Sequence, residues 1–235
     1  MSCKVMGIVN ITPDSFSDGG QFFKPEEAIR RAKNLIEDGA DIIDLGGEST
    51  RPGATPIGWE EEWARIELVL GKVADLGALV SVDTYHPETA ERAIETGAHI
   101  INCVYAEPIP EMLKMLEGND VELVMPASAL STRNPVLSNR IYLDPMIGFG
   151  TTREEDVELL RSIPELAKKG RVLVGASRKR IVKKLTGSKG GVGKNVGGNV
   201  AIAVWAAIQG ASVVRVHDVN ETVQALRVLR ALREE

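Results

Sequence analysis

The sequence predicts an α/β fold, a (β/α)₈ barrel of the TIM type in which residues 1–235 form a single domain. Short apolar runs alternate with amphipathic stretches along the chain. Continuous apolar strands with helical crossovers are typical of a parallel sheet that is buried on both faces. About eight such units can be counted, which is the number that a closed barrel needs. A doubly wound open sheet would show the same alternation, so the count of units favours the barrel.

The predicted elements follow one another in a regular order. Strands coincide with the apolar runs at residues 5–9, 41–45, 79–82, 99–104, 121–125, 141–143, 172–175 and 213–216. Helices coincide with the amphipathic stretches at residues 25–38, 59–75, 87–96, 110–117, 154–168, 178–185, 199–209 and 220–233. Gly39, Gly97 and Gly210 each fall after a helix and before a strand, where glycine supplies the left-handed cap that turns the chain back.

Residues 126–140 interrupt this order. The segment is short and rich in Ser, Asn and Pro, whereas a parallel connection normally takes a dozen or more residues, most of them helical. We therefore expect the helix between the fifth and sixth strands to be missing or shortened, with a loop or one short turn of helix in its place.

The composition fits an ordinary globular protein. The chain has 235 residues, of which 43% are hydrophobic and 26% charged, and its formal net charge is −5. A mildly acidic chain does not indicate nucleic-acid binding, so we expect no nucleic-acid partner. An anionic substrate would have to be bound by local cations and backbone amides, because the overall charge repels it.

The two cysteines and the N-terminus bear on location. Cys3 and Cys103 lack the spacing of a zinc or redox motif, so we expect two reduced thiols. The chain enters a predicted strand almost at its first residue, and no apolar run reaches the ~18 residues of a membrane span. We therefore expect a cytoplasmic protein without a signal peptide or a membrane partner.

Polar side chains follow nearly every predicted strand. A single aspartate in such a place is usually a helix cap or a turn former. In a parallel barrel, however, the carboxyl ends of all strands open on one face, and that face holds the active site. The repetition therefore predicts one polar pocket formed by Asn10, Asp44, Glu48, Asp83, Asn102, Asp144, Ser177, Arg215 and His217.

Two loops on that face are rich in glycine, hydroxyls and carboxylates. Residues 12–20 follow the first strand and residues 46–53 follow the second. Such loops are suited to close over a substrate and exclude water, although they would also suit plain solvated loops. We expect them to be substrate lids.

Four cations also follow strand ends, namely Arg51, Lys179, Arg215 and His217. Arginine matches phosphate oxygens with two parallel hydrogen bonds, and lysine supplies a point charge. Arg215 and His217 share one side of a strand. A pyrophosphate group would need such a cluster, and the Asn10 amide could add an oxygen ligand to a Mg²⁺ ion that the pyrophosphate carries.

Several long motifs in this order resemble those of the dihydropteroate synthase family. They are MGIVNITPDSFSDGG at 6–20, DIIDLGGESTRPGA at 41–54, VSVDTYHPETAERAIETGAHIIN at 80–102, DPMIGFG at 144–150, GASRK at 175–179 and GASVVRVHDV at 210–219. The resemblance implies a (β/α)₈ barrel and a transferase of folate biosynthesis that is a sulfonamide target. Such an enzyme joins 6-hydroxymethyl-7,8-dihydropterin pyrophosphate to p-aminobenzoate and releases pyrophosphate.

The resemblance also implies roles for single residues, carried over motif by motif. Its catalytic residues would be Asp83, Lys179 and Arg215. The pterin-binding residues would be Asp83, Asn102, Asp144 and Lys179. The pyrophosphate-binding residues would be Asn10, Arg51, Arg215 and His217, with Asn10 as the ligand of Mg²⁺. The aminobenzoate-binding residues would be Thr50, Pro52, Phe149 and Ser177. The lid residues would be Thr12, Asp14, Ser15, Phe16, Ser17 and Asp18.

Four positions depart from the family's usual motifs. Cys103 replaces an aspartate, Pro126 a histidine, Met146 a glycine and Thr151 a lysine. These departures keep open a pterin-binding homologue that is non-catalytic or has altered specificity. A second alternative is a methyltetrahydrofolate-dependent methyltransferase, which would share the ring-binding acids but would not need the lids or the anion-binding cations.

The resemblance further suggests a homodimer through helices near the C-terminus. Residues 203–208 and 226–232 offer apolar faces for such contacts. Packing within the core explains those faces equally well.

Overall fold

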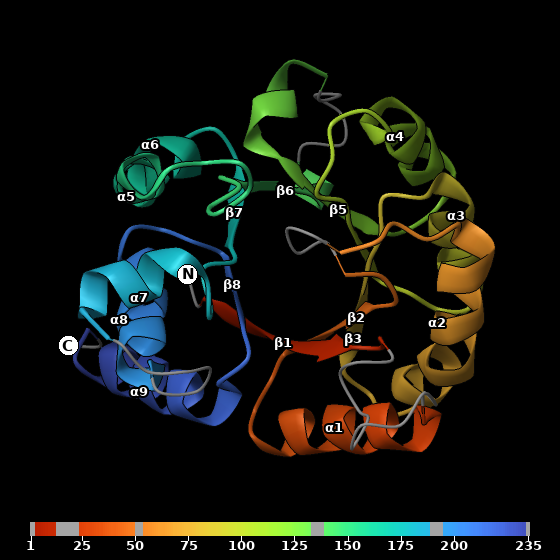
Figure 1. Ribbon diagram of the computed structural model, residues 1–235, viewed down its shortest axis with the longest axis horizontal. Helices are drawn as coiled ribbons and strands as arrows, with labels where there is room; N and C mark the ends of the chain where they lie inside the picture. Colours follow the sequence, from red (N-terminus) through yellow and green to blue (C-terminus); the bar gives the residue numbers. More distant parts are fainter. Residues whose placement is uncertain (1–2, 13–23, 50–53, 133–138, 189–194, 234–235) are drawn as a thin grey trace.

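The computed structural model describes residues 3–12, 24–49, 54–132, 139–188 and 195–233. Within these residues eight strands close into one barrel in chain order, every neighbouring pair is parallel, and β1 pairs with β8. Helices surround the barrel on the outside (Figure 1). The predicted TIM-type barrel is therefore confirmed.

The strands lie close to their predicted positions. They are β1 (Lys4–Asn10), β2 (Ile42–Gly46), β3 (Leu79–Asp83), β4 (Ile100–Asn102), β5 (Glu122–Pro126), β6 (Ile141–Asp144), β7 (Arg171–Val174) and β8 (Val213–Val216). Most of their residues are buried on both faces, because side chains fill the inside of the barrel and helices cover the outside.

The helices follow the strands as the amphipathic stretches predict. They are α1 (Pro25–Glu37), α2 (Trp59–Ala74), α3 (Pro87–Glu95), α4 (Ile109–Gly118), α5 (Arg153–Arg161), α6 (Ile163–Ala167), α7 (Arg180–Thr186), α8 (Val196–Ile208) and α9 (Val219–Ala231). Gly39, Gly97 and Gly210 have φ of +96°, +105° and +99°, so each supplies the left-handed turn expected between helix and strand.

The connection between β5 and β6 is irregular, as predicted. In place of a crossover helix its described part contains η2 (Ala127–Thr132), a short 3₁₀-helix. Residues 133–138 lie outside the described part of the chain. The shortened crossover leaves the pairing intact, since β5 and β6 remain parallel neighbours.

Two predicted helices differ from the observed ones. The predicted helix 154–168 is wrong, because the segment forms two helices, α5 and α6, that meet at Ser162. Pro164 lacks the N–H that would bond to Leu160, and its ring crowds that carbonyl. Helix α8 begins at Val196, three residues before its predicted start, and Gly198 in its first turn is required by packing. A Cβ on Gly198 would lie 2.4 Å from the Thr186 Cγ2 of α7.

The inside of the barrel is apolar in its middle and closed at its lower end. An inner layer is formed by Met6, Ile42, Ile100, Val124, Tyr142, Leu173 and Val213. Below it, the Arg171 guanidinium pairs with Glu122 and lies 3.8 Å from the centre of the Tyr142 ring, whose hydroxyl donates to Glu122 at 3.1 Å. The polar groups of the lower end are therefore paired with one another, and the carboxyl ends of the strands, at the upper end, are where a barrel of this type binds its substrate.

Among the described residues, none of the helices combines the length and the apolar character that a membrane crossing requires.

Candidate active site

Polar residues of β2, β3 and β4 share the inner side of the barrel at its upper end. Alternate residues of a strand point to the same side. The register pairs Asp44 with Ser81, and two residues further along it pairs Asp83 with Asn102. Asp44 follows Ile42 of the inner apolar layer at an interval of two. These four polar residues therefore stand directly above that layer.

Residues of β6 and β8 complete the same level. Asp144 lies two residues beyond Tyr142, and Arg215 lies two residues beyond Val213, both members of the inner apolar layer. Between them, Gly175 directly follows β7 and leaves space, since a Cβ there would lie 3.8 Å from Arg215 Cδ and 4.0 Å from Asp144 Oδ2. Acids and a cation from four different strands, β2, β3, β6 and β8, thus meet at this end of the barrel, with the Asn102 amide of β4 beside them.

Arg215 connects two of these acids. Its Nε donates to Asp44 Oδ2 and its Nη2 donates to Asp83 Oδ2, each at 2.6 Å. The Arg215 side chain is 19% exposed, whereas that of Asp44 is fully buried. Ion pairs removed from water in this way hold a fixed geometry, because neither partner can be left unpaired at low cost. We call Asp44, Asp83 and Arg215 the arginine clamp.

Asp83 titrates near neutral pH. Burial raises the pKa of the Asp83 carboxyl to about 7, Arg215 opposes the rise, and the carboxylates of Asp44 and Glu62 add to it. A carboxyl with such a pKa exchanges its proton at the pH where metabolic enzymes work. Asp83 is therefore suited to accept hydrogen bonds from a ligand and to respond to charge that develops on it.

Lys179 lies on the other side of the mouth. Its Nζ donates to Ile147 O at 2.6 Å and lies 4.3 Å from the centre of the Phe149 ring. Burial lowers the pKa of Lys179 to about 8, although Asp144 opposes the fall. Burial likewise raises the pKa of Asp144, which Lys179 counteracts. The two residues form a second acid–cation pair beside the arginine clamp.

Buried acceptors at this level lack partners. Within the described residues, Asp44 Oδ1, Asn102 Oδ1 and Ser81 Oγ are buried and have no hydrogen bond. Asn102 does donate to Asp44 Oδ2, at 3.4 Å. Buried polar atoms are nearly always hydrogen-bonded. A flat heterocycle with several N–H groups would supply the missing donors.

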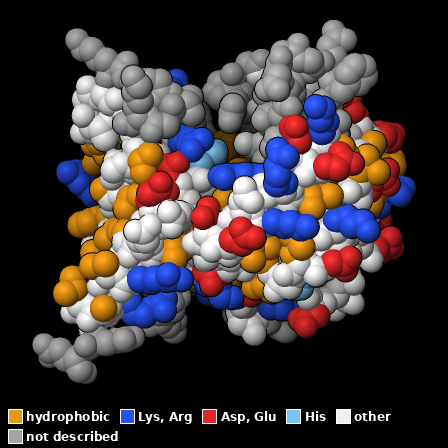
Figure 2. Space-filling view, turned by 90° about the horizontal axis from the view of Figure 1, so that it is seen from below, with side chains coloured by type: hydrophobic (Ala, Val, Ile, Leu, Met, Phe, Trp, Pro, Cys, Tyr) orange, Lys and Arg blue, Asp and Glu red, His pale blue; other side chains and the backbone are white. Residues whose placement is uncertain are grey.

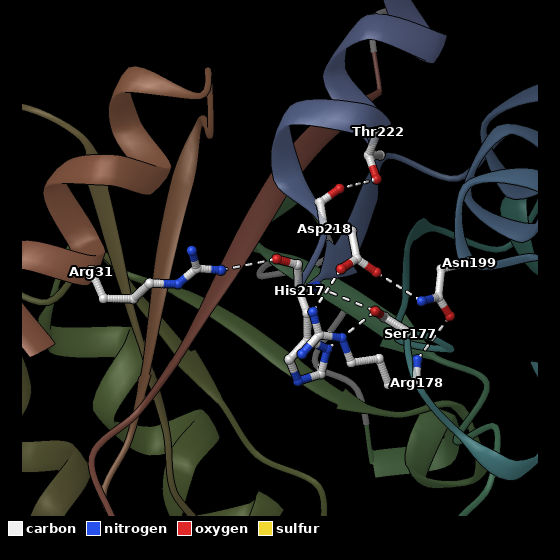
Figure 3. A network of polar contacts seen from close by, with 7 residues as sticks. All are labelled: Arg31, Ser177, Arg178, Asn199, His217, Asp218 and Thr222. Carbon is white, nitrogen blue, oxygen red and sulfur yellow. Dashed lines mark hydrogen bonds and ion pairs between the residues drawn. The ribbon is translucent and has the colours of Figure 1, made fainter. Parts of the chain in front are cut away.

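The ends of β7 and β8 are joined by Ser177 and His217. Ser177 Oγ lies 3.1 Å from His217 Nδ1, and it accepts from the His217 backbone N–H at 3.2 Å (Figure 3). Arg31 of α1 donates to the His217 carbonyl at 3.0 Å. The residue that follows β8, His217, is therefore held by contacts to the loop after β7 and to α1.

Several site residues expected from the sequence can be placed. The structure gathers five of them at the mouth, namely Asp83, Asn102, Asp144, Lys179 and Arg215. The Phe149 ring contacts Lys179, and Ser177 contacts His217. Asn10 ends β1 and pairs in register with Gly46, and Thr12 follows it. The other expected site residues lie outside the described part of the chain; they are Asp14, Ser15, Phe16, Ser17, Asp18, Thr50, Arg51 and Pro52.

Sequence reasoning overlooked one member of the arginine clamp. Asp44 was grouped with the polar strand ends but was given no role in binding or catalysis. Its signal is an acid inside a strand whose five residues are all buried. Buried carboxylates are almost always paired, so such an acid predicts a cationic partner, which is Arg215.

Met146 provides the first test of this local geometry. It has φ of +62°, in the left-handed region that costs a residue with a side chain roughly 1–2 kcal/mol. We expect Met146→Gly to be more stable than Met146→Ala by about 1 kcal/mol, since only glycine relieves the strain while both variants lose the side chain. Urea unfolding of the two variants measures this difference. Equal stability would show that the backbone of residue 146 is not strained.

The closed parallel barrel and its mouth of acids and cations define a barrel enzyme of the pterin-binding class. The model of the family "Pterin binding enzyme" matches residues 6–135 and 127–217. The chain is similar to the dihydropteroate synthase of Staphylococcus haemolyticus, with 35% identity over 98% of this chain and 95% of the relative. It is similar to that of Escherichia coli, with 37% identity over 97% and 90%.

Solved structures agree with these relatives. Xanthomonas albilineans dihydropteroate synthase with 4-aminobenzoic acid has a TM-score of 0.91 and 38% identity, covering 99% of this chain and 94% of that one. The same organism's enzyme in complex with 7,8-dihydropteroate has a TM-score of 0.86 and 34% identity, covering 100% and 95%. The chain belongs to the dihydropteroate synthase family.

Proposed function

We propose that this chain condenses 6-hydroxymethyl-7,8-dihydropterin pyrophosphate with p-aminobenzoate and releases pyrophosphate. The observation that carries the proposal is the arginine clamp beside buried acceptors that lack partners, in a chain of this family. The reaction breaks the bond between the pterin methylene carbon and the pyrophosphate oxygen. It forms a bond from that carbon to the amine nitrogen, which then loses a proton.

The pterin ring would lie between Asp83, Asn102, Asp144 and Lys179. Its N–C–N edge and ring N–H groups need acceptors, and a carboxylate can accept two parallel hydrogen bonds. The unpaired Asn102 Oδ1 and the buried Asp144 carboxyl supply acceptors at the right level. Positive charge builds on the ring as pyrophosphate departs, and Asp83 and Asp144 would stabilise it because buried charges interact strongly.

The pyrophosphate would be bound by the cations of the last two strand ends. Arg215 lies in β8 and His217 directly follows that strand, and Arg51 would add a further guanidinium. Within the described residues no cluster of three or more His, Cys, Asp or Glu side chains could hold a metal. A Mg²⁺ ion would fit the half-buried Asn10 amide together with pyrophosphate oxygens, since Mg²⁺ uses few protein ligands beside substrate phosphates. When bound, it would neutralise charge on the leaving group.

The aminobenzoate would contact Phe149 and Ser177. The Phe149 ring lies under the Lys179 ammonium, so it offers an apolar face at the edge of a cationic site. Thr50 and Pro52 would complete this subsite, and residues 12 and 14–18 would close over it. Sulfonamides, which replace the aminobenzoate carboxylate with a sulfonyl group, would compete for the same place.

Two of the four departures from the family motifs, Thr151 and Cys103, make local side-chain contacts. Thr151 Oγ1 donates to Asp156 Oδ1 at 2.6 Å, and Gly148 N donates to the same carboxylate oxygen at 2.7 Å. Cys103 Sγ donates to the Tyr105 carbonyl at 3.3 Å. Neither contact involves the arginine clamp or Lys179, so we expect the chemistry of the family to be kept.

A coupled assay for pyrophosphate release tests the function. We expect release from the pterin pyrophosphate to require both Mg²⁺ and p-aminobenzoate, with dihydropteroate as the product by mass spectrometry. Pterin binding without turnover would support the non-catalytic alternative. Methyl transfer from methyltetrahydrofolate to a cobalamin acceptor would support the methyltransferase.

We expect kcat/KM to follow a bell-shaped pH profile. The ionised form of Asp83 is needed to accept hydrogen bonds, so kcat/KM should rise through an apparent pKa near 7. The protonated form of Lys179 is needed as a cation, so kcat/KM should fall above about 8. Lys179→Arg should remove the alkaline limb, because arginine stays charged. Steady-state rates from pH 5 to pH 10 measure both limbs, and a flat profile would contradict these roles.

We further propose a homodimer formed through α7, α8 and α9. Exposed apolar side chains gather on these helices, namely Leu185, Trp205, Ile208, Val228 and Leu232. Figure 2 shows hydrophobic side chains along the edge of the molecule on the α9 side. Sedimentation equilibrium of the wild type and Trp205→Glu tests this proposal.

The two unpaired thiols, Cys3 and Cys103, support a reducing, cytoplasmic setting.

A further inference from the structure

Arg178 has a backbone conformation that residues with side chains avoid. Its φ is +60°, and in the described chain only Met146 shares this feature among residues other than glycine. Arg178 is the third residue of a tight turn, closed by a hydrogen bond from Lys179 N to Ala176 O of 3.2 Å. A turn with positive φ at its third position favours glycine or asparagine. Some contact must therefore hold Arg178 in place.

A closed ring of hydrogen bonds provides that contact. Arg178 N donates to Asn199 Oδ1 at 2.9 Å, and Asn199 Nδ2 donates to Asp218 Oδ2 at 2.7 Å. The ring closes where Arg178 Nη2 donates to Asp218 Oδ1 at 2.6 Å (Figure 3). One amide and one carboxylate thus bind both the backbone and the side chain of Arg178.

The two partners of Arg178 are themselves firmly placed. Asn199 is 4% exposed and lies in the first turn of α8, while Asp218 is 8% exposed and directly precedes α9. The Asp218 carbonyl accepts from Thr222 Oγ1 at 2.7 Å. Because Asp218 directly follows His217, the ring also ties the loop after β7 to the end of β8.

We propose that Asn199 and Asp218 are positioning residues for the transfer reaction, holding Arg178 in its left-handed conformation and thereby directing Ser177 and Lys179 into the barrel mouth. The inference rests on the proposed function. In the structure, neither Asn199 nor Asp218 has a hydrogen bond to the arginine clamp. Ser177 and Lys179 flank Arg178, so a change in φ at residue 178 would rotate one of them relative to the other.

Asn199→Ala breaks the bond to the Arg178 backbone. We expect kcat to fall about tenfold, an effect typical of a small misplacement of reacting groups, and the KM for p-aminobenzoate to rise at least about threefold as Ser177 moves. A purely structural role would reduce the fraction of active enzyme and leave KM unchanged. Asn220→Ala, an exposed asparagine in the first turn of α9, is the matched control and should behave as wild type.

Glycine at position 178 separates backbone geometry from packing. Arg178→Gly adopts positive φ without help, so this variant alone should keep kcat within about threefold of wild type. In the Asn199→Ala background it should recover most of the lost kcat and restore KM. A packing defect in α8 would not be repaired by a glycine in the loop after β7. Failure of the double variant to recover kcat and KM would therefore overturn the proposal.

Crystal structures of the variants read the geometry without any substrate. We expect φ at residue 178 to become negative in Asn199→Ala and to return to about +60° in the double variant. Unchanged φ and KM in Asn199→Ala would overturn the proposal. If Asn199→Ala does not fold, Asp218→Asn weakens the same ring and should raise KM in the same direction. A wild type that releases no pyrophosphate would refute the proposed function, whereas the φ values would still decide this inference.

Discussion

Arg215→Met is expected to lower kcat/KM about 1,000-fold and to destabilise the protein by about 3–5 kcal/mol. The substitution removes two short hydrogen bonds and leaves Asp44 and Asp83 facing each other without their shared cation. Removing one member of a buried ion pair costs about 3–5 kcal/mol, because the remaining charge is uncompensated. Removing a donor from a reaction centre typically lowers the rate 10²–10³-fold, and Arg215 would also bind pyrophosphate.

Arg171→Met is the matched control for Arg215→Met. Arg171 lies at the opposite end of the barrel and is also ion-paired, with Glu122. We expect this variant to lose stability and to keep kcat/KM within about threefold of wild type, since it changes nothing at the mouth. Urea unfolding and steady-state kinetics on both variants distinguish a catalytic from a general structural contribution. If Arg215→Met kept more than a tenth of wild-type kcat/KM, the clamp would not belong to the active site.

Asp83→Asn is expected to lower kcat/KM at least about 100-fold, because the amide has one acceptor oxygen in place of two and carries no negative charge to stabilise positive charge on the pterin. The acid limb of the pH profile should disappear with the carboxyl. Asp75→Asn makes the same substitution at an exposed aspartate that directly follows α2, away from the site. This control variant should behave as wild type. Retention of the acid limb in Asp83→Asn would assign that limb to a different group.

The same substitution has a predictable effect on stability. The pKa of Asp83 is raised from 3.8 to about 7 by burial, so the folded protein binds this proton more tightly than the unfolded chain. The associated stability is fully present below pH 3.8 and is lost as pH rises through about 7. Asp83→Asn has no carboxyl to ionise and does not lose this stability. The free energy of unfolding of the variant, relative to that of the wild type, should therefore increase from pH 4 to pH 8. Unfolding curves across this range measure the trend, and an opposite trend would contradict the raised pKa.

The barrel was predictable because its signals are local and repeated. Apolar runs mark strands buried on both faces, as β2 illustrates with five buried residues, and glycines such as Gly97 mark the turns between helix and strand. Two exceptions have different causes, a local helix breaker in one and tertiary packing in the other. Pro164 divides a helical pattern, and Gly198 lies inside a helix because α7 approaches it too closely for a side chain.

The site was predictable to the extent that it consists of strand ends. Asp83, Asn102, Asp144 and Arg215 could be grouped because parallel strands all end on one face. Contacts between distant residues carry no such local signal. The pairing of Asp44 with Arg215 spans 171 positions, and the ring around Arg178 joins side chains from three elements. Such partners become visible only when the chain is folded.

The position of a bound pterin tests the central claim most directly. We predict that a crystal structure of the protein with a pterin will place the ring inside the barrel mouth. Its N–C–N edge should lie within hydrogen-bond distance of Asp144 and Asn102, and Lys179 and the arginine clamp should border it. A ring bound elsewhere, with Asp83, Asp144 and Arg215 making no contact to it, would contradict the account.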